Sequence, residues 1–196
     1  MTGTALPDAQ GLSGLDIDSR TGWPEELRVL LDKYPRDSWR SRPTPVAQFW
    51  LDRHDWFRHQ CAALKSAGDD YREGRSDAMA YASWLAPQLQ NFLAHLHGHH
   101  QVEDYHYFPA FRAAEARLAP GFDALAADHE LLHEGISDVV ASVNAFFETL
   151  RSENAADATR HAADRYIACS ETTFRRLLRH LSDEEDLIIP VMLDRG

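Results

Sequence analysis

The chain carries one short pattern twice, and this repeat constrains the fold more than any other feature. The two copies are His99-x-x-x-Glu103 and His180-x-x-x-Glu184, each within an apolar, helix-like stretch. Residues four apart on an α-helix lie on one face, so each copy offers an imidazole nitrogen and a carboxylate to the same point in space. A fold that holds both copies must bring two helices together so that these polar groups share one site.

Composition excludes several classes of protein. At 196 residues, with 44% hydrophobic and 26% charged residues, the chain suits one globular domain. Its net charge of -11 argues against binding to nucleic acid or to an anionic membrane, because both need a basic surface. The first ten residues lack the basic start and apolar run of a signal peptide, and no apolar run approaches a membrane span. We therefore expect a cytoplasmic protein.

Apolar residues at helical spacing predict four long helices from residue 45 onward. The first has Thr44 as its N-cap and Pro45 at its first position, and it should stop near Gly68. The second should open at Ser76, a good capping residue, and should kink or break at Pro87.

The other two predicted helices follow the same logic. The third should start after Pro120-Gly121 and the fourth near Asn154. Pro109 and Pro190 follow the two His-x-x-x-Glu patterns, and we expect them to end the second and fourth helices.

No strand-like alternation occurs, so the sequence predicts an all-α protein. The connections between the four helices are short, which favours antiparallel neighbours and an up-down-up-down four-helix bundle over residues 45–196. Residues 1–44 are expected to form an N-terminal extension with one additional short helix, which opens at Trp23-Pro24 and runs to about Tyr34.

Polar residues interrupt the apolar stripe of all four predicted helices. In chain order they are His54, then His99 and Glu103, then His129 and His133, then His180 and Glu184. At 1.5 Å per residue, His54 and His129 lie ~14 Å and ~12 Å from the starts of their helices. By the same measure, Glu103 and Glu184 lie about 9 Å from the expected ends of theirs. Because the first and third helices start where the second and fourth finish, all the candidates fall in one layer.

This layer of five imidazoles and two carboxylates indicates a metal site. Such groups would be costly to bury without partners. A single tetrahedral zinc ion uses four ligands, so seven are too many for one ion. Imidazoles with carboxylates suit iron, and carboxylates can bridge two ions. The residues therefore predict two metal ions.

Neighbouring polar residues receive a simpler interpretation. His100 is rotated by about 100° from His99 around the helix, which favours a surface or outer position. His97 is interpreted in the same way. Asp104 and Glu185, which follow the two candidate carboxylates, are expected to be solvated.

A ferritin-like site is the main alternative, since it uses Glu-x-x-His on two helices and a lone glutamate on the other two. Glu103-x-x-His106 and Glu130-x-x-His133 match by letter. However, no glutamate occurs between Glu26 and Glu73, so the first long helix offers none. The histidine-rich interpretation fits all four helices better.

Residues 45–192 resemble hemerythrin and the hemerythrin-like cation-binding (HHE) domains. The resemblance rests on the histidines and glutamates of the layer and on the words HHQVEDYHYFP and HLSDEEDLIIP. It implies a non-haem di-iron centre with bridging carboxylates, held by His54, His99, Glu103, His129, His180 and Glu184, with His133 a seventh ligand that not every member uses. Oxygen-carrying hemerythrins place the last carboxylate five residues after the histidine, which would be Glu185, whereas the spacing of many bacterial relatives favours Glu184.

The resemblance implies a protein that binds or senses dioxygen or nitric oxide. The same ligands would serve a di-iron oxidoreductase acting on peroxide, nitric oxide or dioxygen, or an iron-handling protein, so the sequence does not decide whether the chain is an enzyme. Zinc could replace iron, since imidazole suits both metals. A site inside a bundle leaves little room, so we expect its partner to be a small diatomic or peroxide ligand. Nothing indicates a protein partner or an oligomeric state.

Overall fold

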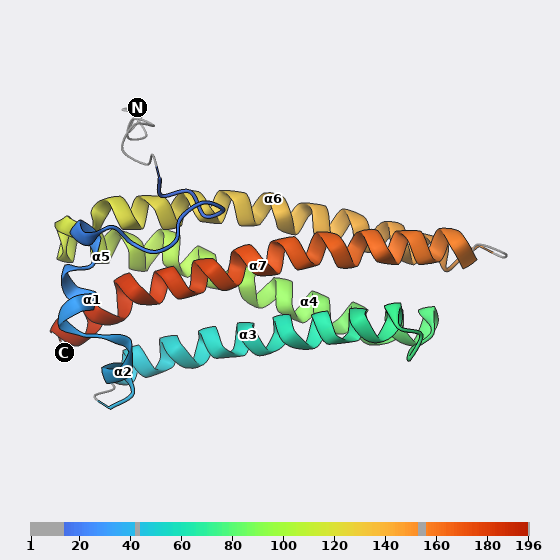
Figure 1. Cartoon of the computed structure of the whole chain (residues 1–196), viewed down its shortest axis with the longest axis horizontal. Helices are drawn as coiled ribbons and strands as arrows, with labels where there is room; N and C mark the ends of the chain where they lie inside the picture. The colour runs from blue at the N-terminus through green and yellow to red at the C-terminus, as the bar shows by residue number, and fades with distance from the viewer. Residues whose placement is uncertain (1–13, 42–43, 153–155, 196) are drawn as a thin grey trace.

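The chain folds into a bundle of long α-helices. The computed structural model describes residues 14–41, 44–152 and 156–195. Within these ranges the four longest helices are α3 (Pro45–Arg72), α4 (Ala78–Val102), α6 (Ala119–Thr149) and α7 (Ala156–Arg195). Figure 1 shows them side by side, with consecutive helices running in opposite directions. No strand occurs in the described ranges, so the all-α prediction is confirmed.

Several short helical pieces lie outside the four long helices. The link between α4 and α6 contains the π-helical turn η2 (Glu103–Tyr107), α5 (Phe108–Ala114) and the 3-10 turn η3 (Ala116–Leu118). Before the bundle lie η1 (Glu25–Leu27), α1 (Val29–Lys33) and α2 (Arg36–Trp39). The single short helix expected to run from Trp23 to about Tyr34 is therefore two pieces. Arg28, with φ -94° and ψ 2°, interrupts it, so that Leu27 and Leu30 are both buried.

The prolines do not end their helices, contrary to expectation. Pro109 lies in the first turn of α5, where a missing N–H costs little, and the π-turn η2 has already broken the regular hydrogen-bond pattern before it. Pro190 lies inside α7, which continues to Arg195. Ile188, Ile189 and Val191 beside it are fully buried, and this apolar burial offsets the lost hydrogen bond. Pro87 likewise lies inside α4, which continues without a break.

Helix starts were predicted to within about three residues. Thr44 caps α3, as expected, because its side chain accepts a hydrogen bond from the Ala47 N–H at 3.2 Å. Ser76 does not cap α4; Asp77 does, by accepting from the Ala80 N–H at 2.8 Å. Asp is as good a cap as Ser, so the local pattern allowed either. The expected start of the last helix near Asn154 lies outside the described residues, and α6 begins at Ala119, just before Pro120-Gly121.

Gly68 is a packing contact, although we expected it to end the first long helix. A Cβ atom at this position would lie 3.2 Å from Ile167 Cγ1 of α7, which is tighter than ordinary contact. The missing side chain lets α3 and α7 approach closely, and α3 continues to Arg72.

Two apolar clusters form the core and are separated along the bundle axis. The first lies toward the α3–α4 and α6–α7 connections and includes Phe57, Leu85 and Leu177. The second lies at the other end and includes Trp50, Phe122 and Leu187. Leu27, Leu30 and Trp39 of the N-terminal segment belong to this second cluster, so the segment packs onto the bundle (Figure 1). None of the described helices combines the length and apolarity needed to span a membrane.

The capping assignment can be tested directly. Asp77→Ala should lower the free energy of unfolding by about 1 kcal/mol, because the Ala80 N–H loses its acceptor. Ser76→Ala should change it by less than about 0.5 kcal/mol, since that side chain caps nothing and donates only to the neighbouring Asp77 carbonyl. Urea titration followed by circular dichroism measures both. Equal losses in the two variants would contradict the assignment.

Candidate metal centre

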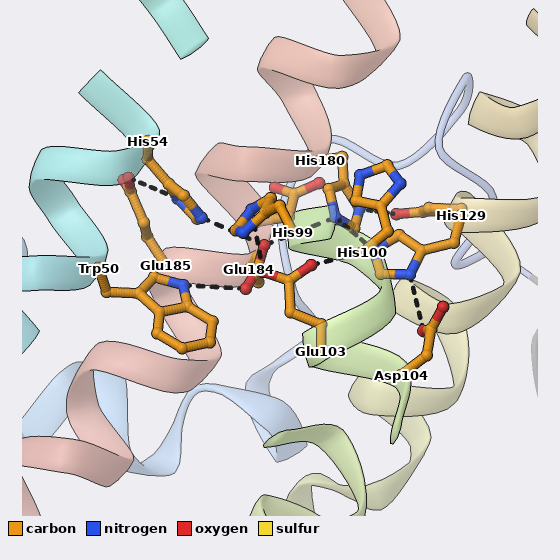
Figure 2. Close-up of polar contacts among 12 residues, drawn as sticks. Trp50, His54, His99, His100, Glu103, Asp104, His129, His180, Glu184 and Glu185 are labelled. Atoms are coloured by element: carbon orange, nitrogen blue, oxygen red, sulfur yellow. Dashed lines mark hydrogen bonds and ion pairs between the residues drawn. The ribbon is translucent and has the colours of Figure 1, made fainter. Parts of the chain in front are cut away.

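Histidine and glutamate side chains from all four long helices and η2 converge between the two apolar clusters. Figure 2 shows them pointing toward one another. One group consists of His54, His99, Glu103 and Glu184, and the other of His100, Glu103, His129 and His180. Within each group, one possible ligand atom from every residue lies within 4.8 Å of the others. We call these the first and second ligand groups.

The two carboxylates lie between the two sets of histidines. Glu103 belongs to both groups, with Oε1 2.9 Å from His99 Nε2 and Oε2 3.5 Å from His129 Nε2. Glu184 Oε2 is 3.5 Å from both His54 Nε2 and His180 Nε2, so it also contacts a histidine of each group. Carboxylates placed in this way can each bridge two cations.

The donor atoms fit a metal because several of them are buried and lack hydrogen-bond partners. Among the described residues, these include the Nε2 atoms of three histidines, both oxygens of one glutamate and one oxygen of the other: His54, His99, His100, Glu103 and Glu184. Buried polar atoms are nearly always paired in folded proteins. Their shared inward direction is therefore the arrangement expected of metal ligands.

Burial shifts the pKa values of these groups. It raises the pKa of Glu103 well above its usual range, and burial together with the charge of Glu103 does the same to Glu184. Burial lowers the pKa of His99 to about 4 and that of His180 to about 3. The histidines are therefore held neutral, which is the form that binds metal. The carboxylates are destabilised as anions, and nearby cations would reverse this penalty.

Comparison with protein families agrees with this geometry. Residues 46–194 match the family described as "Hemerythrin HHE cation binding domain". The chain belongs to the hemerythrin HHE cation-binding family. No curated protein and no solved structure matches it. In this hemerythrin-like domain, both ligand groups lie within the matched residues.

Outer carboxylates orient three of the histidines in the hemerythrin-like domain. His54 Nδ1 lies 3.0 Å from Glu185 Oε1, and His129 Nδ1 lies 2.8 Å from Asp104 Oδ1. His180 Nδ1 lies 3.3 Å from Asp128 Oδ2. A carboxylate only accepts, so each Nδ1 carries the proton and each Nε2 presents a lone pair to the ligand groups, where those of His129 and His180 lie 3.1 Å apart.

The surroundings of Glu185 and Asp104 differ from the expectation that both are solvated. Glu185 is 4% exposed and also accepts a hydrogen bond from Arg58 at 2.8 Å. Asp104 is half-buried against His129. Glu184, in contrast, lies inside the first ligand group and accepts a hydrogen bond from Trp50 Nε1 at 3.0 Å. The adjacent residues Glu184 and Glu185 of α7 thus differ in position, because Glu184 faces the ligand groups and Glu185 lies behind His54.

Six of the seven predicted ligands lie in the two groups, and His133 does not. Its Nε2 atom is 3.5 Å from Nδ1 of His100, so it lies behind that ring. His129 and His133 are one turn, about 6 Å, apart along α6, and His100 occupies the space that His133 would need to reach the site. The assignment of each group as metal-binding stays a prediction.

His100 was missed as a candidate ligand, and a surface position, one of the two that we expected for it, is wrong. Its side chain is fully buried and stacks on His129 with ring centroids 4.1 Å apart. A bundle helix has neighbours on two sides, so adjacent residues can both be buried, each facing a different helix. His99 faces His54 of α3, whereas His100 faces α6 and α7. The available signal was that Glu103 lies three residues after His100, a spacing that also shares a helix face.

Substitution of His100 and of His133 distinguishes the ligand set that the structure favours from the one that the sequence predicted. His100→Ala should lower the metal content of the purified protein, because a buried donor of the second group is lost. His133→Ala should leave the content unchanged, since its imidazole belongs to neither group. Elemental analysis of both variants measures this. Metal lost from His133→Ala but kept in His100→Ala would restore the sequence assignment.

Proposed function

We propose that the chain is a non-haem di-iron protein that binds or senses dioxygen or nitric oxide. Two observations support it. The ligand groups offer two sets of donors that share carboxylates, and a cavity of about 360 Å³ reaches one of those sets. The cavity is the observation that supports ligand binding, because a purely structural metal site needs no such opening.

The donor chemistry favours two iron ions. The first group offers two imidazoles with carboxylates, the donor set typical of non-haem iron centres that keep positions open for a ligand. The second offers three imidazoles and the shared Glu103. Iron held by these residues would supply Lewis acidity and a change of oxidation state.

The cavity lies between α3 and α4 and ends at the first ligand group. His99 and Glu103 line it, together with Phe49, Trp50, Arg53, His95, Gly98, Val102 and Tyr107. The side chain of His99 is 10% exposed, whereas that of Glu103 is fully buried. Small ligands could therefore reach the first group along the edge of His99. The volume exceeds what a diatomic molecule needs, so this face of the site is more open than the sequence indicated.

The chain's own groups would hold the site in place during ligand exchange. Trp50 Nε1 donates to Glu184, and Glu185 fixes the ring of His54. The contact between Glu185 and His54 lies outside the cavity, so ligands could enter and leave without disturbing it, whereas Trp50 lines the cavity and would hold Glu184 beside the entering ligand.

Reduction of peroxide or nitric oxide is a second candidate. Tyr107 lines the cavity, and its ring lies 4.6 Å from Trp50. It would place a phenolic O–H, which can donate a proton, near the first group. This candidate also needs an external electron donor.

The proposal predicts iron stoichiometry and a ligand response. Protein reconstituted with ferrous iron without oxygen should hold two iron ions per chain. After oxidation, azide should produce a new charge-transfer absorption band, and dioxygen or nitric oxide should change the spectrum of the reduced protein. One iron per chain would contradict the di-iron assignment. A spectrum unchanged by every small ligand would favour an iron-handling role, and multiple turnover of peroxide with a reductant would favour the oxidoreductase.

The access route is tested by filling the cavity at Gly98. A Cβ atom there would meet nothing within 4 Å, so a side chain can leave the backbone at this position without a clash. Gly98→Leu should slow azide association several-fold in stopped-flow measurements, while iron content stays unchanged. His97→Leu is the matched control, because that neighbouring residue is exposed and does not line the cavity. Equal rates in the two variants would contradict entry between α3 and α4.

A further inference from the structure

A buried arginine connects the N-terminal segment to the metal centre. Arg20 lies before residues 46–194, the part of the chain that matches the family. Its side chain has no exposed surface, although the segment around it lies at the outside of the bundle. A guanidinium buried this completely is rare unless it is paired, so its partners show what it does.

Arg20 uses all three of its nitrogen atoms. Nη2 donates to Asp128 Oδ2 at 2.5 Å, Nε donates to Asp183 Oδ2 at 2.6 Å, and Nη1 donates to the Leu15 carbonyl at 2.6 Å. Trp23 packs over the guanidinium at 4.7 Å and donates to the Asp183 carbonyl at 2.7 Å. The segment is thus attached to α6 and α7 through one rigid fork.

Asp128 contacts both Arg20 and a candidate metal ligand, His180. The Oδ2 atom that accepts from Arg20 is the same atom that lies 3.3 Å from His180 Nδ1. On the other edge of that ring, His180 Nε2 belongs to the second ligand group. The position of the Asp128 carboxylate therefore sets the orientation of the His180 ring.

Asp128 depends on Arg20 more than Asp183 does. Asp183 has a second cationic partner, Arg179, at 2.7 Å. Among the described residues, Asp128 has Arg20 as its only arginine or lysine partner, and it is 2% exposed. Without Arg20 its buried charge would lack compensation, so the carboxylate would turn away or admit water.

We propose that Arg20 is a positioning residue of the metal centre, holding Asp128 and through it His180, so that metal affinity at the second ligand group depends on the N-terminal segment. This rests on the proposed metal binding but not on dioxygen or nitric oxide as the ligand. It assigns a role in the centre to a part of the chain outside the family match.

The test compares two arginines of the same segment. Arg36 is the matched control, since it pairs with Asp186 through two hydrogen bonds of 2.7 and 2.8 Å, and within the described part of the chain Asp186 has no hydrogen bond or ion pair to a residue of either ligand group. Iron-loaded wild type, Arg20→Met and Arg36→Met are exposed to a chelator, and iron release is followed over time. Arg20→Met should release one ion about 10–100-fold faster than wild type, the usual effect of losing an outer partner of a ligand. Arg36→Met should release iron like wild type.

Further variants keep the proposal falsifiable if Arg20→Met folds poorly. Asp128→Asn should reproduce the faster release, and adding Arg20→Met to it should have little further effect, because both act on one contact. Arg20→Lys keeps the charge but loses the fork, so its release rate should lie between wild type and Arg20→Met. Circular dichroism checks that each variant is folded.

Two results would overturn the proposal. Equal acceleration in Arg20→Met and Arg36→Met would show that only docking of the segment matters. Wild-type release rates in Arg20→Met would show that His180 does not depend on Arg20, and wild-type rates in Asp128→Asn would show that it does not depend on the Asp128 charge. The iron content of the wild type separately tests the di-iron assignment, so failure of one proposal is distinguishable from failure of the other.

Discussion

The burial of two carboxylates among histidines is the constraint on which the rest of the structure depends. Glu103 and Glu184 have no exposed surface, and three of their four oxygens lack hydrogen-bond partners among the described residues. Such groups in an apolar interior would oppose folding unless positive charge compensates them. The apolar clusters on both sides hold the helices close enough to keep water out. The centre therefore exchanges some stability of the metal-free protein for a site in which donors are already in place.

Charge alternates outward from this centre. Three of the histidines, His54, His129 and His180, are backed by further carboxylates, and two of those carboxylates are backed by arginines. Glu185 accepts from His54 and from Arg58 of α3, and Asp128 contacts His180 and accepts from Arg20 of the N-terminal segment. Each set of charged or polar groups compensates the charge of the set inside it, and in this way a protein can bury several ionisable groups together. The N-terminal segment thus contributes both a cover of apolar side chains and one of the charges in this arrangement.

The π-turn η2 lies where the shared carboxylate is needed. Glu103 is its first residue, and α4 ends immediately before it. Such turns are rare and are often found at functional sites. Here the irregular turn follows two adjacent histidines that face different helices, and it separates the ligand-bearing part of α4 from Pro109 and α5. The cavity lined by Val102, Glu103 and Tyr107 opens at the same place, so the local irregularity coincides with the accessible face of the centre.

The sequence by itself determined the helical class and the choice of most donors. Helical periodicity is a local property, so the spacing of His99 and Glu103, and of His180 and Glu184, was enough to place each pair on one face. Counting along four helices also brought His54 and His129 into the same layer. Helix ends were less certain, because Ser76 and Asp77 are both good caps and because tertiary burial allowed α7 to continue past Pro190.

Only the tertiary structure decided which side chains meet across helices. His100 takes a place in the second ligand group and His133 does not, because the rotation of α4 against α6 and α7 determines which ring is nearer. The spacing of residues along one helix gives no information on how that helix is rotated relative to its neighbours. The contacts of Arg20 could be predicted from the sequence even less, since Arg20 lies over a hundred residues from its partners Asp128 and Asp183. No periodic pattern connects them, and their pairing follows from the packing of the N-terminal segment against α6 and α7.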